Sequence, residues 1–309
     1  MYFPKAKKII ALGLFMVVIL AGLSGCRSEN PRPGDPTPSL ESPALTDTPA
    51  ATATVTPTPE PGALIVNGES VPLSEFEAQL LQLQAADIEL AKTRTPEEQR
   101  QMVLDELVDQ TLLSQAAFES GFEIDDEGLQ QRIDSLAANL GGQAALDTWI
   151  STNGYTIASF HSAMRRAAAS AWQRDSLMDT VPETAEQVNA QQILVRSPDT
   201  VADILRRLNA GAEFATLAAE YDPITSGILG WFPRGYLTQP LVEEAAFALL
   251  PGAFSAAIET DFGYHIIYVM ERESERTLSV DARLTLQHKV IENWLVERRA
   301  AATVEILLP

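Results

Sequence analysis

The sequence predicts an α+β protein, in which a small antiparallel sheet with surrounding helices is inserted into a mostly helical domain. Three observations lead to this prediction. Residues 74–177 carry apolar side chains at helical spacing, between start and stop signals for several helices. From residue 188, short strand-like runs alternate with short helices and with turns that contain Gly or Pro. After residue 280 the pattern returns to one long helix and a last short strand.

The N-terminus has the layout of an export signal. Lys5, Lys7 and Lys8 precede an apolar run over residues 9–20, which is short for a membrane span. Leu23-Ser24-Gly25-Cys26 follows and resembles a bacterial lipobox, in which Cys26 becomes the lipidated first residue. We therefore predict a lipoprotein signal peptide over residues 1–26 and an extracytoplasmic, membrane-attached protein. A transmembrane anchor and an unmodified cysteine are the alternatives.

Charge and cysteine content narrow the classes of partner. The net charge is −20, so the chain lacks the clustered Lys and Arg that nucleic-acid binding needs. The same charge disfavours anionic lipid surfaces, so membrane attachment is expected through the lipid on Cys26 alone. Solubility is a sufficient explanation for the acidity. Cys26 is the only cysteine, which excludes an internal disulfide.

Residues 27–62 separate the signal from the folded part. They hold nine of the nineteen prolines, together with many Thr, Ser and Ala residues. Such a composition supplies no apolar core, and we predict a stiff, disordered linker that holds the folded part away from the membrane.

Residues 63–185 form the first predicted domain segment, which is mostly helical. Residues 63–71 indicate a hairpin with an Asn67-Gly68 turn. Ser74 with Glu77, and Thr95 with Glu98, have the spacing of capping boxes at two helix starts. The remaining helices are expected to start at Asp125 or Asp126, to cover about 143–152, and to run from Thr156 to about Leu177.

Residues 186–273 form the second segment, with the order βααβαββ. We expect strands over 188–195, 229–232, 254–258 and 265–270, and helices over 201–208, 214–221 and 241–249. Residues 274–309 then supply a helix over about 280–300 and a strand over 303–308. An isolated helix and strand bury nothing by themselves, so both are expected to dock onto residues 63–180, with the last strand beside the hairpin. The middle segment is then an insertion in one helical domain.

Three strings in the middle segment carry a family resemblance. They are Leu229-Gly230-Trp231-Phe232-Pro233-Arg234-Gly235, the run from Glu243 to Leu249 before Pro251-Gly252, and Thr260-Asp261-Phe262-Gly263-Tyr264-His265-Ile266-Ile267. Their order and spacing resemble the parvulin (PpiC) family of peptidyl-prolyl cis-trans isomerases. The insertion in a helical domain resembles the SurA and PrsA foldases, which have chaperone domains built from both sides of a parvulin.

The resemblance implies a reaction on X–Pro peptide bonds of unfolded or partly folded exported proteins. Rotation about such a bond breaks no covalent bond and needs no nucleophile, and we expect no cofactor and no metal. His161 and His288 have no second ligand at metal spacing. An apolar, dry surface that grips the proline ring favours the twisted amide, which is less polar than the planar one.

The resemblance also implies the substrate-binding residues, which are Leu229, Phe232, Leu237 and Val242. The family usually has an aromatic residue near Val242, for which this chain offers Val242 or Leu241. Ordinary core packing is the alternative for all four side chains.

The implied catalytic frame is His265, Gln192 and Asp222. Parvulins usually carry a second histidine where this chain has Gln192, and a Gln192–His265 hydrogen bond is expected in its place. A structural role is the alternative for His265. Asp222 lies in a loop that is shorter than usual, and helix termination before Pro223 is its alternative.

Two functions remain open. The first is a membrane-anchored isomerase that assists the folding of exported proteins. The second is a non-catalytic chaperone, or holdase, with a degenerate parvulin domain, which the missing histidine and the short loop favour. A solute-binding lipoprotein would need two lobes of alternating strand and helix, which residues 74–177 do not supply. A homodimer is one alternative for the oligomeric state.

Overall fold

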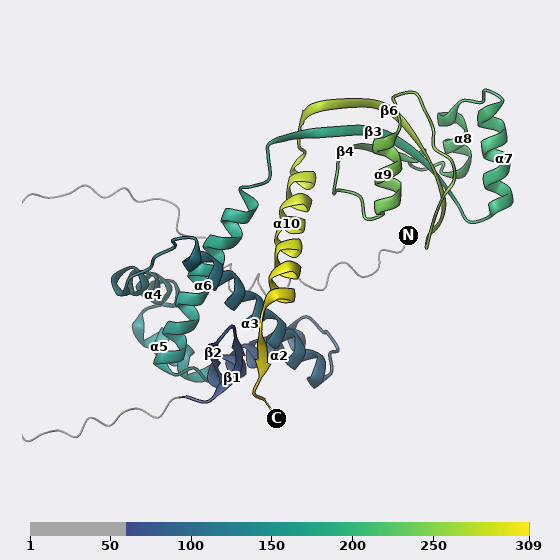
Figure 1. Ribbon diagram of the computed structural model, residues 1–309. Helices are drawn as coiled ribbons and strands as arrows, with labels where there is room; N and C mark the ends of the chain where they lie inside the picture. The colour runs from purple at the N-terminus through teal and green to yellow at the C-terminus, as the bar shows by residue number, and fades with distance from the viewer. Residues whose placement is uncertain (1–59, 309) are drawn as a thin grey trace, which may run out of the picture. The chain divides into compact units, whose positions relative to one another are not determined.

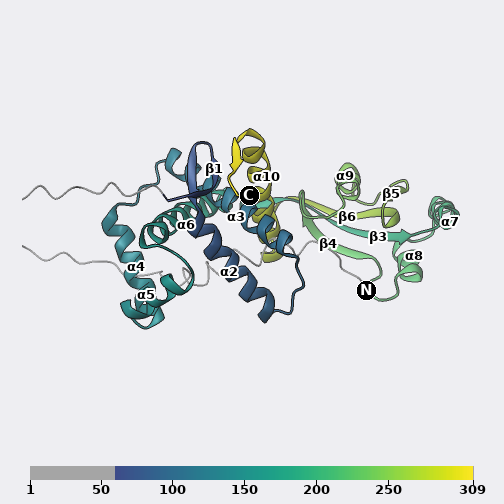
Figure 2. The same ribbon diagram turned by 90° about the horizontal axis from the view of Figure 1, so that it is seen from below.

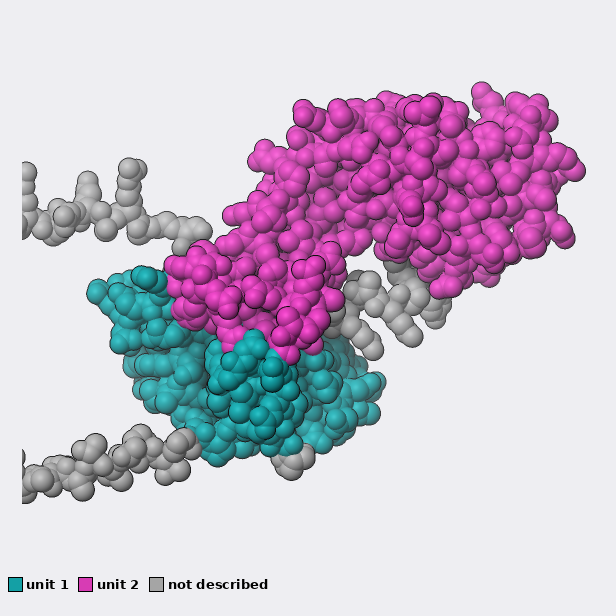
Figure 3. All heavy atoms as spheres, viewed as in Figure 1, with its two compact units in different colours: residues 1–111, 123–167, 303–309 teal, residues 112–122, 168–302 magenta. Residues whose placement is uncertain are grey.

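The computed structural model describes residues 60–308, so the predicted signal peptide, Cys26 and most of the predicted linker lie outside the described residues. The described chain contains helices and two antiparallel sheets (Figure 1). It divides into two compact units, which Figure 3 distinguishes by colour. Within the described range, unit 1 holds residues 60–111, 123–167 and 303–308, and unit 2 holds residues 112–122 and 168–302. The predicted domain boundaries stay predictions.

Unit 1 contains a three-stranded sheet built from both ends of the described chain. Its order is β2-β1-β7, with β1 at Gly62–Val66, β2 at Glu69–Pro72 and β7 at Val304–Ile306. Asn67 and Gly68 adopt positive φ angles of 52° and 87°, as a tight hairpin turn requires. The Asn67 side chain also accepts a hydrogen bond from the Thr303 amide at 2.9 Å. The predicted hairpin and its pairing with the last strand are confirmed.

The helices of the N-terminal part follow the predicted order. They are α2 Leu73–Glu89, α3 Pro96–Glu119, α4 Asp126–Leu140, α5 Gln143–Thr152 and α6 Ile157–Met178. Thr95 and Glu98 form the predicted capping box, with N–H···O distances of 2.9 and 3.2 Å. The capping box predicted at Ser74 and Glu77 is wrong: the N-cap of α2 is Pro72, two residues earlier, and it makes no side-chain cap. The Ser74 amide donates to the Glu60 carboxylate instead, at 3.3 Å.

A buried ion pair joins α2 to α6 inside unit 1. Both Glu75 and Arg166 are buried, and Arg166 Nη1 donates to Glu75 Oε1 at 2.6 Å. An apolar cluster of this unit includes residues of both helices and comprises Ala78, Leu129, Ile133, Leu136, Ala137, Leu146, Ile150, Tyr155, Phe160, Ala163 and Met164. A charge in such surroundings is tolerated only with its partner, so the pair fixes the contact between α2 and α6.

None of the helices within residues 60–308 combines the length and the hydropathy that crossing a bilayer requires.

The sheet of unit 2 has four antiparallel strands in the order β4-β3-β6-β5. The strands are β3 Thr184–Val195, β4 Ile228–Pro233, β5 Ile258–Thr260 and β6 Gly263–Thr277, and the helices between them are α7 Pro198–Asn209, α8 Phe214–Tyr221 and α9 Pro240–Ala248. The predicted order βααβαββ, and with it the α+β fold class, is confirmed.

One predicted strand, over residues 254–258, is wrong in extent. Phe254 forms only an isolated bridge with Tyr268, and the regular strand β5 starts at Ile258. The physical reason lies at Ser255, whose hydroxyl oxygen accepts the hydrogen bond of the Ile267 amide at 2.9 Å. A side chain takes the place that a backbone carbonyl occupies in a regular ladder, so the ladder is interrupted there.

Helices cover both faces of this sheet (Figures 1 and 2). On one face, α7 and α8 pack on Ile193, Val195 and Ile266. On the other, α9 packs through Val242, Ala246 and Phe247 on the strand residues Val188, Ala190, Phe232, Ile267 and Val269. We call this second face the α9 face.

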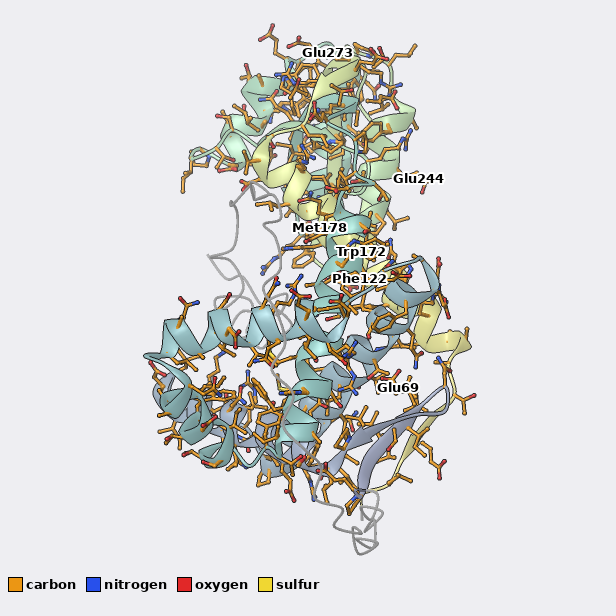
Figure 4. All side chains as sticks on the ribbon, turned by 90° about the vertical axis from the view of Figure 1, so that its left-hand side faces the viewer. Glu69, Phe122, Trp172, Met178, Glu244 and Glu273 are labelled. Atoms are coloured by element: carbon orange, nitrogen blue, oxygen red, sulfur yellow. The ribbon has the colours of Figure 1, made fainter. Side chains whose placement is uncertain are left out.

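Helix α10, Val280–Ala301, also belongs to unit 2. Its first turns form a small apolar cluster in which Val181, Leu278 and Ala282 are buried. The last residues of α3 and the second half of α6 complete the unit. Phe122 and Trp172, labelled in Figure 4, make a tilted ring contact there with centroids 5.7 Å apart.

The buried ion pair gives a testable prediction for unit 1. Arg166→Met should lower the free energy of unfolding by about 3–5 kcal/mol, because it leaves a buried carboxylate without its cation. The matched control is Arg100→Met, which removes an exposed i,i+3 pair with Glu97 and should change stability by about 0–1 kcal/mol. Urea unfolding followed by circular dichroism measures both. Equal losses in the two variants would contradict the interpretation.

Candidate active site

The site is built on the pairing of β3 with β6. In this register Leu194 lies opposite His265, and Gln192 lies opposite Ile267. Side chains alternate between the faces of a strand, and Ile267 and Val269 belong to the α9 face, so His265 points to the α9 face as well. His265 Nδ1 lies 3.0 Å from Gln192 Oε1. The predicted hydrogen bond between these residues, which are 73 positions apart, is therefore present.

A third residue, which the sequence analysis missed, completes this arrangement. Thr260, the last residue of β5, places its hydroxyl oxygen 2.9 Å from His265 Nε2. The tight turn from β5 to β6, with Thr260 paired to Gly263, brings the two side chains together. A hydroxyl residue five positions before the histidine, with an Asp-Phe-Gly turn between them, is the sequence signal that could have found it.

Burial favours the neutral form of the His265 imidazole over the charged form. The side chain is 4% exposed, and desolvation lowers its pKa from the usual value of 6.5. His265 Nδ1 faces Gln192 Oε1 at 3.0 Å, and Nε2 faces the Thr260 hydroxyl oxygen at 2.9 Å, so the tautomer of the ring decides which nitrogen donates. The Thr260 hydroxyl also donates to the Gly263 carbonyl at 3.2 Å. Both nitrogens are engaged, so the ring is fixed in place and its orientation is set by two neighbouring strands.

The four residues predicted to bind the proline ring fall into two groups. Phe232 and Val242 are 0% and 2% exposed and belong to the packed core of the α9 face. Leu229 and Leu237 are partly buried and pack against that core. Leu241, the alternative to Val242, is 57% exposed. The burial favours core packing for Phe232 and Val242, and it leaves Leu229, Leu237 and Leu241 as the side chains that a substrate can reach.

The Asp222 carboxylate is engaged within its own loop. It accepts hydrogen bonds from the Thr225 hydroxyl and from the amides of Ile224 and Thr225, both at 3.1 Å. The hydrogen bond from the Thr225 hydroxyl is also the largest of the effects that lower the pKa of this carboxyl. Asp222 follows directly after α8, so its contacts favour the alternative in which it ends the helix and shapes the loop. Its predicted catalytic role stays a prediction.

The loop from Asp222 to Gly227 is fastened to β3 beside the site. The backbone N–H of Gln192 donates to the Gly227 carbonyl at 2.8 Å, and the side-chain amide of Gln191 donates to the Ser226 carbonyl at 3.2 Å. Gly227 has a φ of 66°, and a Cβ there would lie 1.9 Å from the Gln192 carbonyl oxygen. Only glycine permits this approach. The short loop therefore fixes the backbone of Gln192.

Glu243 on α9 is another residue of the site that the sequence analysis missed. The Glu243 carboxylate accepts hydrogen bonds from the amides of Gly235 and Leu237, at 2.7 and 2.9 Å. These contacts hold the segment that carries Leu237 against the start of α9. An acidic residue in the first turn of a helix is common for helix-dipole reasons alone, which is why the sequence did not single it out.

The arrangement can bind an apolar group and orient it. Within the part of the chain that the structure describes, there is no group of three or more His, Cys, Asp and Glu side chains that could hold a metal ion. What the site does offer is a set of partly exposed leucines on the α9 face, next to a rigid polar pair, His265 and Gln192.

Comparison with known protein families assigns both parts of the chain. Residues 180–271 match the PPIC-type PPIase domain, also called rotamase, and residues 54–149 match the SurA-like N-terminal domain. One segment of the chain thus matches a parvulin-type isomerase domain and another matches a SurA-like domain, as the resemblance implied.

Individual relatives carry the names of foldases and chaperones. The foldase protein PrsA of Halalkalibacterium halodurans is 29% identical over 66% of this chain and 65% of its own length. That of Caldanaerobacter subterraneus is 44% identical over 29% of this chain and 30% of its own length. The chaperone SurA of Methylobacillus flagellatus is 33% identical over 41% of this chain and 34% of its own length. The chain therefore spans less than two thirds of these relatives.

Among solved structures, a peptidylprolyl isomerase (PrsA) from Bacillus cereus is similar with a TM-score of 0.42 and 20% identity, covering 77% of this chain and 85% of the other.

The burial of His265 gives a testable prediction. Its pKa in the native protein should lie below the value in the unfolded chain, since desolvation disfavours the charged ring. The native state then binds this proton less readily than the unfolded state. Its contribution to stability is present above the unfolded pKa and is lost as the pH falls toward the native pKa.

Titration of the ¹³C-labelled imidazole by NMR, in native buffer and in concentrated urea, measures both values. The His265→Asn variant identifies the resonance by its loss. A native midpoint at or above the unfolded one would show that the ring is not desolvated.

Proposed function

We propose that this protein is an extracytoplasmic foldase that catalyses the cis-trans isomerisation of X–Pro bonds in exported polypeptides and is attached to the membrane through a lipid on Cys26. The observation that carries the catalytic part is the His265–Gln192 hydrogen bond on the α9 face, beside partly exposed leucines, within residues that match a PPIC-type PPIase domain. The polypeptide substrate class is supported by relatives named foldase and chaperone.

In this proposal catalysis is selective binding of the twisted amide. Rotation about a peptide bond crosses a barrier of roughly 18–20 kcal/mol, because it removes the resonance of the amide. At the midpoint the carbonyl is less polar, so an apolar surface stabilises the twisted amide more than the planar one. Leu229, Leu237 and Leu241 would grip the pyrrolidine ring. Each 1.4 kcal/mol of such selective stabilisation is worth about tenfold in rate.

His265 acts in this scheme as a positioning residue. Both of its ring nitrogens already have partners within the protein, Gln192 and Thr260. The ring therefore joins β3, β6 and the end of β5 through side chains, which keeps the strands that carry the site from moving apart. A glutamine in place of the family's other histidine can serve this purpose, since its amide both donates and accepts.

A holdase without isomerase activity is the second candidate. It is supported by the glutamine at position 192, by the absence of an aromatic side chain at the exposed position 241, and by the Asp222 carboxylate engaged within its own loop. In that case the SurA-like segment, residues 54–149, would bind unfolded chains by itself.

A protease-coupled assay with a proline tetrapeptide, on residues 27–309, separates the two candidates. We expect catalysed isomerisation, and a fall in kcat/KM of about tenfold for Leu237→Ala, since the lost apolar contact is worth roughly 1–2 kcal/mol. His265→Ala should also slow the reaction. Ile88→Ala, a truncation of an exposed side chain on α2, is the control and should match the unmodified protein.

Two outcomes would overturn the isomerase proposal. A rate equal to that of buffer, together with suppression of aggregation of an unfolded client, would establish the holdase. Full activity in both site variants would mean that the reaction takes place elsewhere on the chain.

The membrane attachment has its own test. Cells that express the full chain and are grown with labelled palmitate should incorporate the label into the protein, and the protein should sediment with membranes. Cys26→Ser should abolish the label, because no other cysteine is present. Membrane attachment that persists in this variant would favour the transmembrane anchor.

A further inference from the structure

The contacts of helix α10 connect it to the candidate site, although it lies outside the matched isomerase domain. That domain ends at residue 271, whereas α10 covers Val280–Ala301. The helix nevertheless contacts the segment Gly235–Leu237, which leads from β4 to α9 and carries the substrate-binding residue Leu237.

Each of the three residues in this segment meets α10 in a different way. At Gly235 the backbone is so close that a Cβ would lie 3.0 Å from Leu286 Cδ2. The ring of Tyr236 packs in the apolar cluster to which Leu286 and Val290 of α10 also belong. The Leu237 carbonyl oxygen lies 3.5 Å from Lys289 Nζ, which donates to it. The contact is therefore continuous along the segment.

The same segment is also held by α9. The Glu243 carboxylate binds the amides of Gly235 and Leu237, while α10 contacts the Leu237 carbonyl and the ring of Tyr236. Tyr236 also packs on the core of the α9 face, so its ring joins the two apolar clusters. Leu237 is thus fixed by two helices, and only one of them lies in the matched domain.

Helix α10 has anchors of its own that do not involve the sheet. The Ser279 hydroxyl caps its first turn by accepting from the Ala282 amide at 3.2 Å. The Gln287 side chain donates to the carbonyl of Met178, the last residue of α6, at 3.3 Å. Arg298 lies 3.6 Å from Glu119 at the end of α3. The place of α10 is therefore set by the helical part of unit 2.

We propose that α10 is a positioning element of the isomerase site, and that Leu286 and Lys289 set the placement of Leu237 for the X–Pro substrate. This inference rests on the proposed isomerase function. Its physical basis is that catalysis by selective binding depends on geometry, and a misplacement of about 1 Å can cost on the order of 100-fold in rate. The placement of Leu237 then depends on residues outside the matched isomerase domain. These are Met178 at the end of α6 and Glu119 at the end of α3, which anchor α10.

Kinetics on residues 27–309 test the positioning role. Leu286→Ala and Lys289→Met should each lower kcat/KM for a proline peptide several-fold, in a protein that stays folded by circular dichroism. Val296→Ala, on an exposed position of the same helix, is the matched control and should leave kcat/KM unchanged. If Leu286 acts through Leu237, its effect should largely disappear in the Leu237→Ala background, since coupled residues are not additive.

Hydrogen exchange supplies a readout that does not depend on activity. In both α10 variants the peptide covering residues 234–239 should exchange faster, because the Gly235 and Leu237 amides bonded to Glu243 open more often. Exchange in α8 should stay the same. Unaltered exchange over 234–239, or full additivity of Leu286→Ala with Leu237→Ala, would overturn the inference. An inactive parent protein in which exchange over 234–239 still rises in the variants would remove the isomerase function and leave the α10 contact established.

Discussion

The antiparallel pairing of β3 with β6 is the constraint on which the candidate site depends. Residues 184–195 and 263–277 are far apart in the sequence, and their register places Gln192 within hydrogen-bond distance of His265. A slip of one residue would turn every side chain of the strand to the other face. It would remove His265 from the α9 face, and it would take Ile267 and Val269 out of the apolar core in which they are now buried. The burial of these apolar residues therefore also secures the polar contact.

Around this pairing, short-range contacts hold the two segments that complete the site. Gly227 lets the loop after α8 approach the backbone of Gln192, and Glu243 fixes the segment that carries Leu237. Both contacts use backbone atoms of Gln192, Gly235 and Leu237, so they orient these segments without occupying the side chains of Gln192 and Leu237. The arrangement fits a reaction in which a rigid apolar surface selects one geometry of an amide and takes no part in covalent chemistry.

The sequence was informative where local patterns decide structure and less so where tertiary contacts do. Capping residues such as Thr95 and Asp125 correctly located helix starts, because the cap is a contact within one turn. Ser255 interrupts the beginning of a predicted strand, so that the regular strand starts only at Ile258, through a side-chain bond to Ile267 that no local pattern reveals. The resemblance to parvulins correctly predicted that His265 and Gln192 lie on neighbouring strands. The apolar pattern of α9 could not decide between Leu241 and Val242, and only the packing of the helix on the sheet shows which one is buried. Thr260 and Glu243 were missed because each acts on a neighbour that the fold supplies.

The most direct test of the account is to locate a bound proline peptide on the protein. In an NMR titration of residues 27–309 with an Ala-Ala-Pro-Phe peptide, the account predicts chemical-shift changes at Leu229, Leu237, Leu241 and the imidazole of His265. It also predicts exchange cross-peaks between the cis and trans forms of the peptide. Shift changes confined to the face covered by α7 and α8, with the α9 face unaffected, would contradict it.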